Sequence, residues 1–141
     1  MAYENLHGIL PALMTAFTDD GTRIDPARIR ALVRRLITSG VHGLYVGGSS
    51  GEMLLCSTEE RMELLETVLD VTKSANRPVS VIAHVGSTGT RETIALARHA
   101  AKAGADAVSS VTPLYFAYSF AEVRRFYEEI AAATELPVVI Y

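Results

Sequence analysis

The sequence has no tryptophan and only one cysteine, Cys56, in its 141 residues. A single cysteine excludes an intramolecular disulfide framework and a cysteine-based metal cluster, so a reducing cytoplasm is the expected location. No apolar run approaches the ~20 residues that would span a bilayer. The first residues have neither the basic start nor the apolar stretch of a signal peptide. We therefore expect no membrane partner.

An excess of charge of one sign is also absent. The formal net charge is −3 at pH 7, and acidic and basic residues are interspersed along the sequence. This pattern offers no electrostatic attraction for nucleic acid, and we expect no nucleic-acid partner. No set of His, Asp and Glu has the spacing of metal ligands, so we predict no metal site.

What the sequence does contain is a regular alternation of apolar runs and segments of helical periodicity. The apolar runs are continuous, as in strands buried on both faces of a parallel sheet. The predicted strands begin near Gly8 and cover 43–46, 79–83, 107–111 and 138–141. Helices are predicted to begin at Asp25–Pro26, at Ser57 with Glu60 as a capping box, near Thr90, and at Ser119 with Glu122 as a second capping box.

This alternation predicts an α/β protein, a (β/α)8 TIM barrel of which the chain supplies about the first five strands and four helices. Residues 1–141 are then the N-terminal part of a single barrel domain, since a complete barrel needs roughly 250 residues. The competing architecture is a small doubly wound sheet. No glycine-rich dinucleotide turn follows the first predicted strand, which argues against that alternative. Pro11 argues mildly against an interior position for the first strand, because proline donates no ladder hydrogen bond.

The loops that follow the strands would carry the chemistry of a barrel. The loop at 47–52 reads Gly-Gly-Ser-Ser-Gly-Glu, and its hydroxyls Ser49 and Ser50 are suited to binding a carboxylate or a phosphate. A glycine-rich turn with solvent-exposed serines is the structural alternative. Glu52 is expected to bond to backbone amides of its own loop.

Two tyrosines follow later strands. Tyr115 could relay protons or hold a substrate through its phenol, although for this residue alone an aromatic plug at the barrel mouth or an oligomer contact is the better interpretation. Tyr141 ends the last strand and is a catalytic candidate only because of its place at the same barrel end. His84 ends the third predicted strand and is interpreted as a hydrogen-bonded packing residue.

Four segments together resemble one known superfamily. They are Gly-Leu-Tyr-Val-Gly-Gly-Ser-Ser-Gly-Glu at 43–52, Ile-Ala-His-Val-Gly at 82–86, Ala-Val-Ser-Ser-Val-Thr-Pro-Leu-Tyr-Phe at 107–116 and Val-Val-Ile-Tyr at 138–141. They look like the N-acetylneuraminate lyase and dihydrodipicolinate synthase superfamily, class I aldolases on a (β/α)8 barrel that form a Schiff base with pyruvate. The second segment is more similar to the sialic acid lyase branch.

The resemblance implies roles for individual residues. Ser49 and Ser50 would bind the carboxylate of pyruvate or of the 2-keto acid, and Ser50 stands where the superfamily more often has threonine. Tyr141 would shuttle a proton to and from the bond being broken. Tyr115 would cross a subunit contact to complete a relay with Ser49.

The implied activity is cleavage of N-acetylneuraminate, a sialic acid, to pyruvate and N-acetylmannosamine. The implied enzyme is a homotetramer that acts on small-molecule 2-keto acids without a metal or an organic cofactor. Dihydrodipicolinate synthase and a 2-keto-3-deoxy sugar acid aldolase are alternatives within the superfamily. A non-catalytic barrel that binds a ligand or serves as a scaffold is an alternative of another class.

The Schiff-base lysine is the main departure from the superfamily. It comes from the sixth strand, whereas this sequence stops on the fifth predicted strand. The only lysines present are Lys73 and Lys102, each near the end of a predicted helix. Both are expected at the barrel end opposite the active site, so neither is a candidate for the nucleophile.

Overall fold

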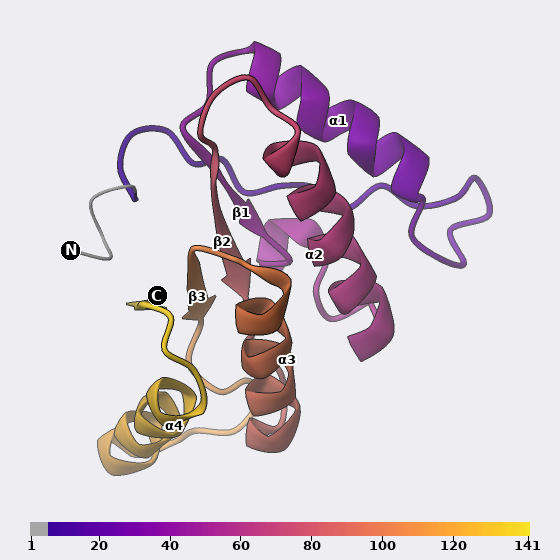
Figure 1. Cartoon of the computed structure of the whole chain (residues 1–141). Helices are drawn as coiled ribbons and strands as arrows, with labels where there is room; N and C mark the ends of the chain where they lie inside the picture. The colour runs from indigo at the N-terminus through magenta and orange to yellow at the C-terminus, as the bar shows by residue number, and fades with distance from the viewer. Residues whose placement is uncertain (1–5) are drawn as a thin grey trace.

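A computed structural model describes residues 6–141 and contains one parallel sheet with helices along its outer side (Figure 1). The strands are neighbours in chain order: β1 (Gly43–Val46), β2 (Ser80–His84), β3 (Ala107–Ser110) and β4 (Val138–Ile140). The helices are α1 (Pro26–Thr38), α2 (Thr58–Lys73), α3 (Thr90–Ala103) and α4 (Phe120–Ala133), and a short 3-10 helix, η1 (Ser49–Gly51), follows β1. All strand pairs are parallel.

The helices begin where their capping residues predict. At the start of α1, the carboxylate of the capping residue Asp25 accepts hydrogen bonds from the amides of Ala27 and Arg28. The expected capping boxes are both present, at Ser57 and Glu60 for α2 and at Ser119 and Glu122 for α4. Such caps satisfy amides that have no partner within the helix. α3 ends at a glycine, Gly104, in the left-handed conformation.

The prediction of five strands is wrong by one within residues 6–141. The first predicted strand runs beside β1, where the carbonyl of Pro11 accepts from the Tyr45 amide at 3.0 Å and the Leu13 amide donates to the Tyr45 carbonyl at 2.8 Å. Within the described residues a single isolated bridge, between Ala12 and Tyr45, joins this segment to β1. Pro11 has no N–H, so the ladder with β1 lacks the hydrogen bond that an amide at this position would donate. The segment is therefore an extended edge rather than a full strand.

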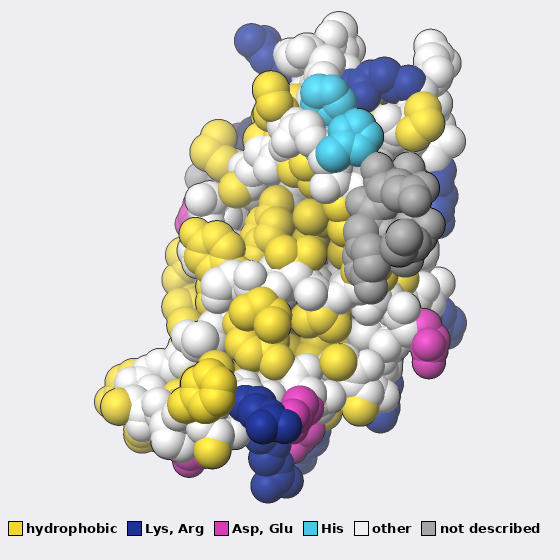
Figure 2. Space-filling model, turned by 90° about the vertical axis from the view of Figure 1, so that its left-hand side faces the viewer, with side chains coloured by type: hydrophobic (Ala, Val, Ile, Leu, Met, Phe, Trp, Pro, Cys, Tyr) yellow, Lys and Arg dark blue, Asp and Glu magenta, His cyan; other side chains and the backbone are white. Residues whose placement is uncertain are grey.

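The two faces of the sheet carry different side chains because successive residues of a strand alternate between faces. One face packs under the helices and forms the core, with Leu44, Val81 and Val108 almost fully buried. Figure 2 looks onto the side of the molecule away from α1, α2 and α3, and apolar side chains gather in its centre. By strand register the inner face carries Tyr45, Ile82, Ala107, Ser109 and Val139.

This arrangement is part of a (β/α)8 barrel wall. Each helix returns the chain to the next parallel strand, and the strand order never reverses. A doubly wound sheet reverses its strand order at a switch point, so the competing architecture is excluded for these four strands. Within residues 6–141, no helix is both long enough and apolar enough to cross a membrane.

Candidate active site

All four candidate residues follow the carboxyl ends of parallel strands. Ser49 and Ser50 open η1 after β1, Tyr115 lies in the loop after β3, and Tyr141 directly follows β4. The Tyr141 amide donates to the Ser110 carbonyl at 3.2 Å, which continues the pairing of β4 with β3. Because all strands point the same way, the four residues lie at one end of the sheet, where barrel enzymes carry their chemistry.

The backbone conformation and the packing of the loop after β1 both require its glycines. Gly47 has a φ of +72°, a conformation that other residues rarely adopt. A Cβ at Gly48 would lie 2.6 Å from the Tyr45 ring, so no larger residue fits. The Thr15 hydroxyl donates to the Gly51 carbonyl at 2.6 Å and ties the loop to the first extended segment. The backbone of this loop is therefore fixed, and Ser49 and Ser50 lie exposed at the carboxyl end of β1.

Glu52 does not behave as predicted. It is exposed and adopts a left-handed conformation, with φ of 57°, as the residue that ends η1. Its amide donates to the Ser49 carbonyl, but within residues 6–141 its carboxylate makes no hydrogen bond to an amide of its own loop. The backbone turn itself therefore shapes the loop, without help from the carboxylate.

Tyr115 stands apart from the other candidates. Its side chain is 92% exposed, its φ is 80°, and its ring packs edge-on against Phe116 with centroids 4.9 Å apart. No contact joins it to Ser49 within residues 6–141. A non-glycine residue at positive φ stores backbone strain, and an exposed aromatic gains no burial in return. Tyr141 is also exposed, at 80%.

Sequence reasoning missed a polar pair on the inner face. The Tyr45 hydroxyl donates to Ser109 Oγ at 3.0 Å, and the Ser109 hydroxyl donates to the Val139 carbonyl at 2.8 Å. Burial raises the pKa of Tyr45, the bond to Ser109 lowers it, and the nearby Tyr141 raises it further. The sequence did contain a signal for this pair, because Tyr45 and Ser109 are polar residues within otherwise apolar predicted strands. Through Ser109, Tyr45 is therefore linked to the backbone of β4, the strand that Tyr141 follows.

His84 is a packing residue, as predicted. It is only 4% exposed, and its Nε2 accepts a hydrogen bond from the Val111 amide at 3.2 Å. The Arg61 guanidinium donates to the His84 carbonyl at 2.9 Å. Burial and then the positive charge of Arg61 lower the pKa of His84 to about 4, against an opposing hydrogen bond with the Gly47 backbone. The ring is therefore neutral near pH 7 and holds the start of the loop after β3.

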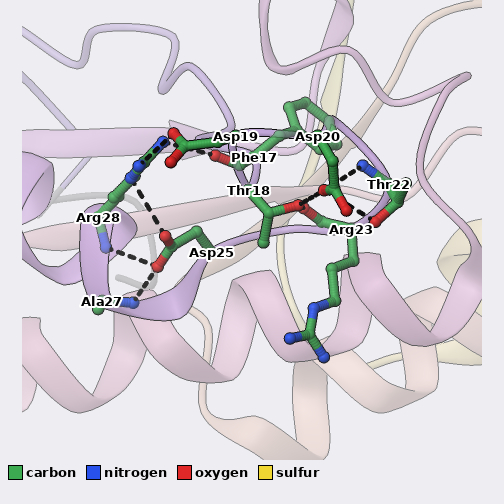
Figure 3. Close-up of polar contacts among 9 residues, drawn as sticks. All are labelled: Phe17, Thr18, Asp19, Asp20, Thr22, Arg23, Asp25, Ala27 and Arg28. Atoms are coloured by element: carbon green, nitrogen blue, oxygen red, sulfur yellow. Dashed lines mark hydrogen bonds and ion pairs between the residues drawn. The ribbon is translucent and has the colours of Figure 1, made fainter.

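The loop that precedes α1 also lies at this edge, and its carboxylates bond to residues of the same loop and of α1 (Figure 3). Arg28 pairs with Asp19 at 2.6 Å and with Asp25 at 3.2 Å. Hydrogen bonds from the Thr18 hydroxyl and from the amide and hydroxyl of Thr22 lower the pKa of Asp20 to about 2. Within residues 6–141, no three or more His, Cys, Asp or Glu side chains are grouped so that they could hold a metal ion.

The two lysines lie at the opposite end of the sheet. Lys73 is the last residue of α2, and its Nζ donates to the Ala103 carbonyl at 3.1 Å, one residue before the turn into β3. Lys102 is in the last turn of α3. Helix carboxyl ends in this fold adjoin the beginnings of strands, so neither ammonium group is near the candidate site.

Comparison with known proteins identifies the family of the chain. The sequence profile of the Dihydrodipicolinate synthetase family matches residues 5–141. The N-acetylneuraminate lyase of Rhizobium meliloti (strain 1021) is 43% identical over 136 residues, which cover 96% of this chain and 44% of that protein.

Solved structures show the same similarity. A crystal structure of N-acetylneuraminate lyase from Mycoplasma synoviae has a TM-score of 0.92 and 36% identity, and covers 99% of this chain and 47% of the other. A prophage protein of the dihydrodipicolinic acid synthase family from E. coli K12, in complex with pyruvate, has a TM-score of 0.88 and 39% identity, and covers 95% and 44%.

A parallel wall with helices outside, and with serines and a tyrosine at the carboxyl ends of its strands, is part of a (β/α)8 barrel. The chain belongs to the Dihydrodipicolinate synthetase family. It spans about half the length of the curated relatives that it matches.

Proposed function

We propose that this chain is the N-terminal part of a single (β/α)8 barrel domain in an enzyme that cleaves N-acetylneuraminate to pyruvate and N-acetylmannosamine. The observation that supports this best is the placement of Ser49, Ser50 and Tyr141 at one end of the sheet, on a loop and a strand end fixed by backbone hydrogen bonds. The names of the relatives point to the same substrate.

In the proposed reaction a lysine amine condenses with the ketone of the substrate and releases water. The resulting iminium accepts the electron pair of the carbon–carbon bond as that bond breaks, which gives an enamine of pyruvate and an aldehyde. Ser49 and Ser50 donate hydrogen bonds to the substrate carboxylate. Tyr141 takes the proton of the hydroxyl that becomes the aldehyde and later returns a proton to the enamine. The lysine is assigned to a strand beyond β4, because Lys73 and Lys102 lie at the other end.

We propose that Tyr115 acts in an assembly of several copies of the chain. We assign it to the active site of a second copy, where its exposed ring completes a proton relay with Ser49 and Tyr141. This role accounts for a strained backbone beneath a side chain that is 92% exposed. The assembly that we propose is a cytoplasmic homotetramer.

Trapping with borohydride tests the Schiff base directly. A full-length protein that carries residues 1–141 is treated with pyruvate and sodium borohydride, and its intact mass is measured. We expect one reduced pyruvate adduct per chain, on a lysine outside residues 1–141. An unmodified protein would support the non-catalytic alternative, and an adduct on Lys73 or Lys102 would overturn the placement of the site.

Substrate assays then separate the enzymes of this family. We expect release of pyruvate from N-acetylneuraminate in a coupled lactate dehydrogenase assay. Condensation of pyruvate with aspartate semialdehyde, without cleavage of N-acetylneuraminate, would instead assign a dihydrodipicolinate synthase.

A further inference from the structure

A buried cation lies between α2 and the sheet. Arg61 is 7% exposed, and its Nη2 donates to the His84 carbonyl at the end of β2. Its Nε–H is buried and has no acceptor within residues 6–141. The nearest charge of opposite sign, Glu92, acts on Arg61 through space while its own oxygens accept from the hydroxyls of Ser87 and Thr58. A guanidinium has only donors, and a buried donor without an acceptor is costly.

A second buried polar atom without a partner belongs to His99 on α3. His99 bonds through Nε2 to a carboxylate oxygen of Glu66 at 2.8 Å, and its Nδ1 is buried with no partner within residues 6–141. In neutral imidazole one nitrogen donates and the other accepts. Because Nε2 faces a carboxylate, which only accepts, Nε2 carries the proton and Nδ1 offers a lone pair. One orphaned donor and one orphaned acceptor are therefore present.

Both residues line the same small cavity. Its volume is about 10 Å³, and apolar side chains such as Leu65, Val85 and Leu96 form much of its wall. A cavity of about 10–15 Å³ holds one water molecule, provided that at least two polar partners are available. The volume excludes anything larger than a single water.

We propose that this cavity is a binding site for one ordered water molecule, which accepts a hydrogen bond from Arg61 Nε and donates one to His99 Nδ1. The water gives each orphaned atom a partner of the required kind. It also completes a path of hydrogen bonds from Glu66 at the surface, through His99 and Arg61, to the carbonyl of His84. That carbonyl ends β2 at the candidate active site, so the water and Arg61 act as positioning groups for this edge.

The first test is a crystal structure of the full-length protein at a resolution that shows ordered waters. We expect one water within 2.7–3.2 Å of both Arg61 Nε and His99 Nδ1. Direct contact between the two side chains, or a cavity without density in a well-ordered region, would overturn the proposal. This outcome does not depend on activity, so it is distinct from a failure of pyruvate trapping.

The second test uses NMR of the wild-type protein and two variants. The Arg61 Nε proton should show a cross-peak to a long-lived water, and the exposed Arg34 should show none. In His99→Leu the cross-peak should be lost, whereas His99→Gln, which keeps a polar partner, should retain it. A cross-peak of unchanged intensity in His99→Leu would show that His99 does not hold the water. If His99→Leu does not fold, the wild-type spectrum decides, because a missing cross-peak for Arg61 refutes the site.

Discussion

Ser49 combines an exposed hydroxyl with a backbone that is fixed by its neighbours. The Glu52 amide donates to its carbonyl, and Gly48 packs against Tyr45, so the loop keeps its shape without the Ser49 side chain. Activity and stability should therefore separate at this residue. The same separation is not expected at Gly48, where any side chain would meet the ring of Tyr45.

For Ser49→Ala in the full-length enzyme we expect kcat/KM to fall by about 10- to 150-fold, because one hydrogen bond to a charged group contributes about 1.5–3 kcal/mol. The Tm should stay within about 1 °C, since surface changes away from the core have little effect on stability. Steady-state assays and calorimetry measure the two quantities. Ser74→Ala, at the opposite end of the sheet, is the control and should leave activity unchanged. Equal losses of activity and stability would make the serine a structural residue.

His84 should make stability depend on pH. Its pKa of about 4 in the folded state lies below the ordinary 6.5, so the unfolded state binds a proton more readily. The free energy of unfolding should be highest above pH 6.5 and should fall by about 3 kcal/mol between pH 6.5 and 4. Urea titrations at a series of pH values measure this change. His84→Gln is the comparison and should lose most of the slope between pH 6.5 and 4. An NMR titration of the His84 ring with a midpoint near 6.5 would contradict the prediction.

At the scale of elements, the helices were the most predictable part of the fold. Their beginnings depend on short-range chemistry, such as the bond between the Ser57 side chain and the Glu60 amide, and this is visible in the sequence. The first strand was less predictable because its pairing depends on β1, where Tyr45 lies 33 positions after its partner Ala12, and on the missing N–H of Pro11.

The caps of α2 and α4 offer a test of that short-range chemistry. Ser57→Ala should lower the free energy of unfolding by about 1 kcal/mol, because the amide of Glu60 loses its acceptor. Urea unfolding of the full-length protein measures the change, and Ser57→Asp, which keeps an acceptor, should restore most of it. An unchanged urea midpoint in Ser57→Ala would show that the cap is dispensable.

The candidate site was predictable only where a loop identified it. The motif around Ser49 was visible because adjacent glycines and hydroxyls are unusual within an apolar sequence. The contacts of Tyr45 with Ser109 and of His84 with Val111 join residues far apart in the sequence and depend on strand register. The relay proposed for Tyr115 would need a second copy, and the pattern of one chain carries no information on such a contact.

At the scale of the whole molecule, the open sheet predicts that the chain self-associates when it is expressed alone. We expect residues 1–141 expressed alone to lack lyase activity and to self-associate. The site has no nearby lysine, one edge of β4 is unpaired within residues 6–141, and Ile140 is 69% exposed. Light scattering and borohydride trapping with pyruvate measure both properties. A monodisperse monomer that forms an adduct at Lys73 or Lys102 would overturn the half-barrel interpretation.

The bond between Tyr45 and Ser109 crosses the sheet from β1 to β3, over the intervening β2. In a flat sheet the backbones of those strands would be about 9.6 Å apart, twice the spacing of neighbours, and the long tyrosine side chain spans that gap. The bond at 3.0 Å ties β1 to β3 across the inner face. Both partners precede β4 in the chain, so a ribosome, which makes a chain from its N-terminus, completes this brace before β4 emerges. In that order of synthesis β1 and β3 would already be tied together when β4 joins the sheet.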